Sequence, residues 1–116
     1  MDIKTSTRQI GDVAIVDASG ELRLGESTNT IRRTVADLLE HGYKNILLNL
    51  RHVRYIDSAG IGELVSCYTS VRNRGGELKL MHLSKNVHNL LQITKLYTIF
   101  QVEEDEATAV ASFHKS

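Results

Sequence analysis

The sequence has no proline, no low-complexity tract and no recognisable internal repeat. Nothing in it marks a linker, and 116 residues is the size of one domain. The only cysteine is Cys67, so an internal disulfide is excluded and the fold does not need an oxidising compartment. We therefore expect a single domain over residues 1–116.

An excess of charge of one sign is also missing, because 14 basic residues balance 14 acidic ones. Proteins that bind nucleic acid without sequence preference normally carry a basic excess, since phosphate neutralisation supplies their affinity. That class is disfavoured here. The chain also lacks a signal-peptide pattern and any run approaching the ~20 apolar residues that a membrane-spanning helix needs. We expect a cytoplasmic protein without a membrane span.

The beginning of the chain predicts a β-hairpin. Residues 3–10 are polar and weakly alternating, as in an edge strand, and the apolar run 13–18 is typical of a strand buried on both faces. The pair Gly11-Asp12 between them predicts the turn. Residues 19–25 lie between glycines and are expected to form a loop.

Helical and extended segments alternate after this loop. Ser27 or Thr28 is expected to cap a helix that ends at Gly42. Residues 51–54 are expected to form a loop. The remaining apolar patterns predict strands at 45–50, 78–81 and 99–102, and helices from 58 to Gly75-Gly76, over 83–93 and over 107–113.

Strand–helix–strand order implies parallel strands joined by right-handed crossovers, and the opening hairpin adds an antiparallel pair. The predicted fold class is therefore α/β, with a mixed sheet of about five strands packed with about four helices. Open sheets of this kind place their sites at the carboxyl ends of the strands. The segment after the predicted central strand is thus the first candidate for a site.

Residues 57–62, Asp-Ser-Ala-Gly-Ile-Gly, follow that strand and violate helix preferences. Gly60 and Gly62 fall near the start of an otherwise good helix, where each costs about 1 kcal/mol relative to alanine. Small residues there would let another protein lie directly on the helix start. Asp57 is a natural N-cap, and Ser58 would follow with its hydroxyl outward. A phosphate on Ser58 would lie at the positive end of the helix dipole.

Other interpretations of this segment are weaker. Asp57-Ser58 can be a plain helix cap. A serine hydrolase would need the nucleophile-elbow glycines around Ser58, which are absent, and the five histidines are scattered. A receiver domain phosphorylated on Asp57 would need an acidic cluster after the first strand, where Asp17 stands alone. The cysteine and histidines lack metal-ligand spacing. We expect no enzyme activity, no metal and no cofactor.

The run Tyr-Ile-Asp-Ser-Ala-Gly-Ile-Gly at residues 55–62 resembles the signature of anti-sigma-factor antagonists, the bacterial STAS domains. Residues 46–50, 19–22 and 75–80 fit as well, so the resemblance covers essentially the whole chain. It implies a partner-switching regulator. In such systems the antagonist with a free serine binds an ATP-dependent anti-sigma kinase and releases a sigma factor. The kinase ends the interaction by phosphorylating the serine, and a phosphatase restores it.

By this resemblance Ser58 is the phosphoacceptor and Asp57 positions it. The implied docking surface consists of Asp57, Ser58, Ala59, Gly60, Ile61, Gly62, Gly20, Glu21 and Arg23. The family commonly has an aspartate where this chain has Arg23, so the local charge is reversed. We expect Arg23, Arg51 and Arg54 to make the site basic.

This departure keeps an alternative open, in which the domain is a STAS scaffold or a transporter-associated regulatory subunit without the usual serine switch. The identity of the bound partner would distinguish the two functions. We expect a monomer or a weak homodimer, because an exposed first strand can pair with a second copy.

Overall fold

The computed structural model describes residues 3–23 and 29–114. Its elements, in chain order, are β1 (Lys4–Ile10), β2 (Val13–Leu22), α1 (Thr30–Glu40), β3 (Asn45–Ile56), α2 (Ser58–Asn73), β4 (Glu77–Met81), α3 (Lys85–Thr94), the 3₁₀ turn η2 (Leu96–Thr98), β5 (Gln101–Glu103) and α4 (Glu106–Ser112). The strands form one sheet in the order β1-β2-β3-β4-β5. β1 and β2 are antiparallel and the later pairs are parallel, which confirms the predicted mixed α/β fold.

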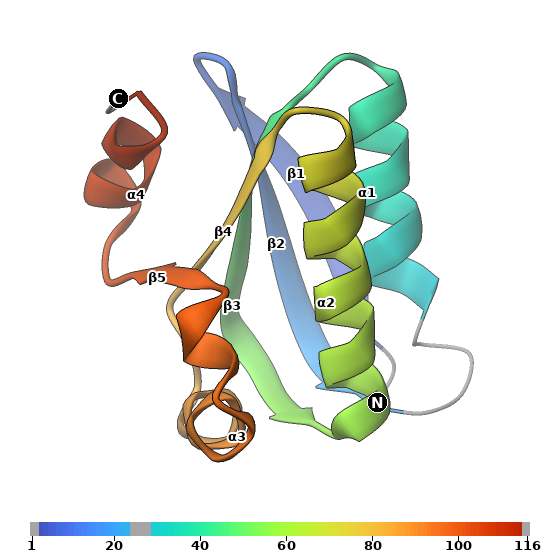
Figure 1. Cartoon of the computed structure of the whole chain (residues 1–116), viewed down its shortest axis with the longest axis vertical. Coiled ribbons are helices and arrows are strands. Elements are labelled where there is room, and N and C mark those ends of the chain that lie inside the picture. The colour runs from blue at the N-terminus through green and yellow to red at the C-terminus, as the bar shows by residue number, and fades with distance from the viewer. Residues whose placement is uncertain (1–2, 24–28, 115–116) are drawn as a thin grey trace.

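Helices lie on both faces of this sheet. α1 and α2 run side by side over one face, and α4 covers part of the other (Figure 1). The larger core lies on the α1–α2 side and a smaller one lies under α4. Ile46 and Leu48 of β3 contribute to the first core, whereas Leu47 contributes to the second. The continuous apolar runs are thus explained by burial on both faces.

Polar contacts fasten α4 to the sheet. Arg8 of β1 forms ion pairs with Asp17 of β2 and with Glu106, the first residue of α4. Hydrogen bonds from Arg8 lower the pKa values of both carboxyl groups. Lys79 of β4, which is buried, donates to Ser112 Oγ of α4 at 2.7 Å. α4 therefore depends on matched side chains as well as on apolar packing.

The prediction of loops at residues 19–25 and 51–54 is wrong for residues 19–22 and 51–54. β2 continues to Leu22 and β3 continues to Ile56. The β2–β3 register shifts twice, and at each shift β3 contributes one residue more than β2.

These two bulges remove the sequence signal of a strand. Leu50, Val53 and Ile56 face the core at intervals of three, with exposed residues between them. A strand is normally recognised by a period of two. The charged residues between the buried ones therefore imitate a polar loop, although the backbone stays paired.

The other boundaries agree with the sequence apart from small shifts. Ser27 and Thr28, the predicted caps of α1, lie outside the described residues. α1 ends before Gly42, whose φ is 90° in the left-handed region that glycine favours. β5 begins two residues later than predicted, because the N–H groups of Ile99 and Phe100 donate to Leu96 O in the turn that follows η2. Within the described part of the chain, no helix is long and apolar enough to cross a membrane.

The bulged part of β3 gives a direct test of this register. Val53→Ala removes a fully buried side chain and should lower the free energy of unfolding by about 2 kcal/mol. Arg54→Ala, at the exposed neighbouring position, should change it by less than about 0.5 kcal/mol. Urea unfolding followed by circular dichroism measures both. Equal effects would contradict the strand register.

Candidate functional site

The start of α2 is built around Asp57 and Ser58. Asp57 follows β3 with an extended backbone, and its Oδ1 accepts the N–H of Gly60 at 3.0 Å. Asp57 is therefore the N-cap of α2, as predicted. Ser58 is the first helical residue and is exposed. Its side chain thus stands at the positive end of a 16-residue helix.

Backbone contacts fix the position of this helix start. The N–H of Asp57 donates to the carbonyl oxygen of Leu22, the last residue of β2, at 3.2 Å. The N–H of Ile56 donates to Oδ1 of Asn86 in α3 at 2.9 Å. The end of β2 and the start of α3 therefore fix the backbone immediately before Ser58.

The two glycines of the motif have different structural roles. Gly60 is buried, and a Cβ there would lie 2.6 Å from both Leu22 O and Ile56 Cγ1. Glycine is required because α2 approaches the strand ends closely. Gly62 is exposed, with nothing within 4 Å of the position a Cβ would take. Gly62 therefore leaves the surface beside Ser58 open.

The predicted docking residues of the α2 start divide in the same way. Ser58 and Gly62 are exposed, and Ala59 is half-buried, as is Asp57. Gly60 and Ile61 are buried. Any partner would meet the first group, while the buried pair holds the helix against the sheet.

The structure brings the end of β2 beside this segment, because Glu21 pairs with Tyr55 across the strands. Gly20, at the second bulge, has a φ of 114° in the region that favours glycine. Arg23 Nη2 lies 3.2 Å from Glu21 Oε2, and its guanidinium carbon lies 4.4 Å from the ring centroid of Tyr55.

Arg23 thus holds an exposed aromatic ring at the edge of the site. Arg51 and Arg54 are exposed on β3. That these three arginines surround Ser58 stays a prediction. A phosphate on Ser58 would be favoured if their guanidinium groups reached it.

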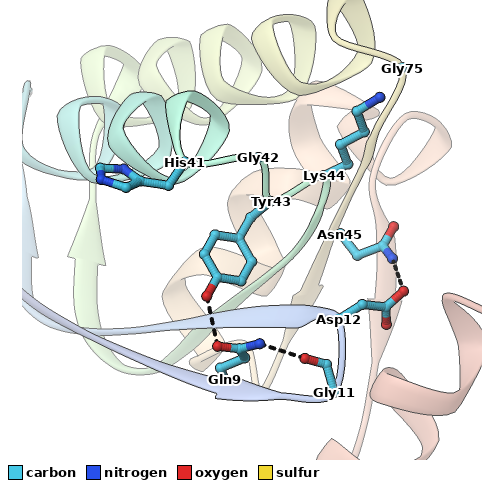
Figure 2. Close-up of a pocket in the computed structure, with 9 residues that line it drawn as sticks. All are labelled: Gln9, Gly11, Asp12, His41, Gly42, Tyr43, Lys44, Asn45 and Gly75. Atoms are coloured by element: carbon cyan, nitrogen blue, oxygen red, sulfur yellow. Dashed lines mark hydrogen bonds between the residues drawn. The ribbon is translucent and has the colours of Figure 1, made fainter.

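A separate depression of about 550 Å³ lies near the β1–β2 turn and the α1–β3 connection (Figure 2). Its polar side chains bond one another: Tyr43 donates to Gln9 at 2.7 Å, and Asn45 donates to Asp12 at 3.2 Å. This depression lies where β3 begins, whereas Ser58 follows the end of β3. Among residues 3–23 and 29–114, no group of three or more histidine, cysteine or acidic side chains is arranged to hold a metal.

An exposed, fixed helix start with a serine and small neighbours at the carboxyl edge of a mixed sheet suits docking of another protein. The family model of the STAS domain matches residues 4–109, so the chain belongs to the STAS domain family. The anti-sigma F factor antagonist of Paenibacillus polymyxa is 25% identical over 111 residues, covering 95% of this chain and 94% of that protein. The anti-sigma-B factor antagonist of Bacillus subtilis is 31% identical over 102 residues, covering 88% and 92%.

Solved structures show the same fold. Unphosphorylated SpoIIAA, an anti-sigma factor antagonist, matches with a TM-score of 0.77 at 18% identity over 94% of this chain and 95% of that chain. The phosphorylated form of SpoIIAA, from Bacillus, gives 0.71 at 17% identity over 94% and 98%. The murine anion transporter Slc26a9 gives 0.74 at 18% identity over 90% of this chain but 18% of that chain. The resemblance read from the sequence is confirmed.

Replacing each of the two glycines with alanine should have opposite effects on the free energy of unfolding. Gly60→Ala should lower the free energy of unfolding by about 1 to 3 kcal/mol, because Leu22 O is backbone and cannot yield easily. Gly62→Ala should raise it by up to about 1 kcal/mol, because alanine favours helix and the space is open. Thermal and urea unfolding of the two variants measure this. Destabilisation by both would contradict the assignment of Gly62 to open surface.

Proposed function

We propose that this protein is an anti-sigma-factor antagonist that acts by partner switching at Ser58. The unphosphorylated form binds an anti-sigma factor, an ATP-binding serine kinase, and so frees a sigma factor. Phosphorylation of Ser58 ends the binding, and a serine phosphatase restores it. The observation that carries this proposal is the exposed Ser58 at the fixed start of α2, in a chain whose relatives are named anti-sigma factor antagonists.

The chemistry of the helix start supports a phosphate switch. A phosphoserine carries about 1.5 to 2 negative charges at pH 7. In the free protein the helix dipole would stabilise that charge by about 0.3 to 1 kcal/mol. A partner lying over Ser58 and Gly62 would have to remove water from the phosphate, and this cost opposes docking.

The proposed docking surface joins the α2 start to the end of β2. Ser58, Ala59 and Gly62 would contact the partner directly, and Glu21 and Arg23 would contact it from the side. Gly60 and Ile61 would act by holding α2 in place. In this proposal the chain is one cytoplasmic domain over residues 1–116, a regulator and not an enzyme, without a nucleic-acid partner.

A second candidate function for the same fold is that of a scaffold or a transporter-associated subunit. The likeness to part of Slc26a9 shows that this fold also occurs within a transporter chain. A scaffold or transporter-associated subunit would bind its partner whether or not Ser58 is charged. Arg23, placed where the family commonly has an aspartate, is the residue that favours this alternative.

Affinity capture from a lysate of the source organism tests the serine switch. Wild type and Ser58→Ala should retain an ATP-binding anti-sigma kinase, and Ser58→Asp should lose it. Ser70→Asp is the matched control, because Ser70 is exposed on the same helix away from its start. This control should bind like wild type.

The captured kinase should also phosphorylate wild type with ATP, as intact-mass spectrometry would detect, and should leave Ser58→Ala unmodified. If the bound proteins are the same for Ser58→Asp and wild type, the serine switch is wrong. A transporter or scaffold component in the capture would favour the second candidate.

Charge reversal at Arg23 tests whether the partner meets the end of β2. Arg23→Asp should weaken binding of the captured kinase about tenfold at low salt, and the effect should shrink at high salt, because exposed charges are screened. Arg74→Asp, exposed at the far end of α2, is the control and should have little effect. Isothermal titration calorimetry at two salt concentrations measures this. Unchanged affinity in Arg23→Asp would place the partner elsewhere.

A further inference from the structure

Glu63, in the second turn of α2, is buried although its side chain is ionisable. Only 4% of its surface is exposed. Its Oε1 accepts the N–H of Arg32, in the first turn of α1, at 3.1 Å. Its Oε2 is buried and has no hydrogen-bond partner within the described part of the chain. A buried polar atom without a partner costs about 1 to 3 kcal/mol, and more when charged, so stability alone does not explain this carboxyl group.

Among the described residues, no side chain next to α1 in the chain caps its start. Asn29, at the N-cap position, makes no side-chain capping bond, and the first turn contains no acidic residue. Asn29 Oδ1 accepts instead from the Arg32 guanidinium at 2.7 Å. The first N–H groups of a helix need acceptors, and a negative charge near them is favourable. Glu63 supplies both from the neighbouring helix.

Opposing effects act on the Glu63 charge. Burial raises the pKa of Glu63, and the bond from Arg32 together with the charges of Arg32 and Arg33 lowers it by less. Cys67, one turn further along α2, is a titratable group that interacts with this charge. Burial, and then the Glu63 charge, raises the pKa of Cys67 to about 12, so the thiol stays neutral. Desolvation therefore outweighs the attraction to the start of α1.

We propose that Glu63 makes the contact between α2 and the first turn of α1 sensitive to protons. The first turn of α1 separates from α2 more often when the Glu63 carboxylate is ionised. It packs more firmly on α2 when this carboxyl group is protonated. Opening returns the carboxylate to water and relieves its desolvation. Protonation removes the charge but leaves Oε1 able to accept the Arg32 N–H, so the contact itself survives.

Linkage fixes the direction of the effect. Because the pKa of Glu63 is raised in the closed state, closing is favoured by proton uptake. The stabilising contribution is complete below the pKa of an exposed glutamate. It is lost as the pH rises through the higher pKa of the closed state. At neutral pH the first turn of α1 is therefore bound to α2 less firmly than it is when Glu63 is protonated.

Amide hydrogen exchange of the full chain, measured by NMR across a pH series, tests this proposal. The protection factor of the Arg32 amide should rise as the pH falls, up to tenfold for each unit by which the pKa exceeds that of an exposed glutamate. The side-chain carboxyl carbon shift of Glu63 should titrate over the same range. Glu63→Gln imitates the protonated acid and keeps the acceptor. It should show higher protection at neutral pH, with no pH dependence.

Glu40→Gln is the matched control, because it removes the same charge from the exposed last residue of α1. It should keep the wild-type pH profile at Arg32. The proposal is overturned if wild-type protection at Arg32 is independent of pH or falls on acidification. It is also overturned if Glu63→Gln lowers this protection at neutral pH, since Glu63 would then be a structural acceptor whose charge strengthens the contact.

Discussion

The geometry of the site depends on one close approach, in which the first turn of α2 lies directly on the ends of β2 and β3. The carbonyl oxygen of Leu22 accepts the N–H of Asp57 at 3.2 Å and leaves no room for a Cβ at Gly60. The carbonyl oxygen of Leu22 therefore orients Asp57 and also excludes any side chain at Gly60. With the cap and the glycine fixed, Ser58 between them has to face outward.

α1 and α2 both begin at the carboxyl end of the parallel strands, and their starts are satisfied in different ways (Figure 1). α2 is capped locally by Asp57, which leaves Ser58 exposed. α1 receives its acceptor from Glu63, a residue of α2. One helix thus carries the carboxylates for both starts. The surface around Ser58 and the anchoring of α1 are consequently linked through α2.

Local rules predicted the fold class and the cap, because Asp57 and Ser58 act within one helical turn. The sequence could not separate Gly60 from Gly62, since the difference lies in an approach by Leu22 from another strand. Glu63 was missed as well. It lies on the buried side of α2 with Cys67, and its partner is a backbone group 31 residues away. Contacts of that separation leave no local pattern.

Exposed segments of this protein differ in whether a change in their length would alter strand register, and the two bulges of β3 show this difference. Each bulge is a residue of β3 with no counterpart in β2. The first turns Val53 to the inner face, and the second returns Ile56 to that face just before the cap. Deleting one residue between 51 and 55 would erase a bulge and turn everything after it to the opposite face. The turn at Gly11-Asp12, by contrast, joins two strands that pair without a register shift. Whether an exposed segment tolerates an inserted or deleted residue therefore depends on strand register. Solvent exposure alone does not predict this tolerance.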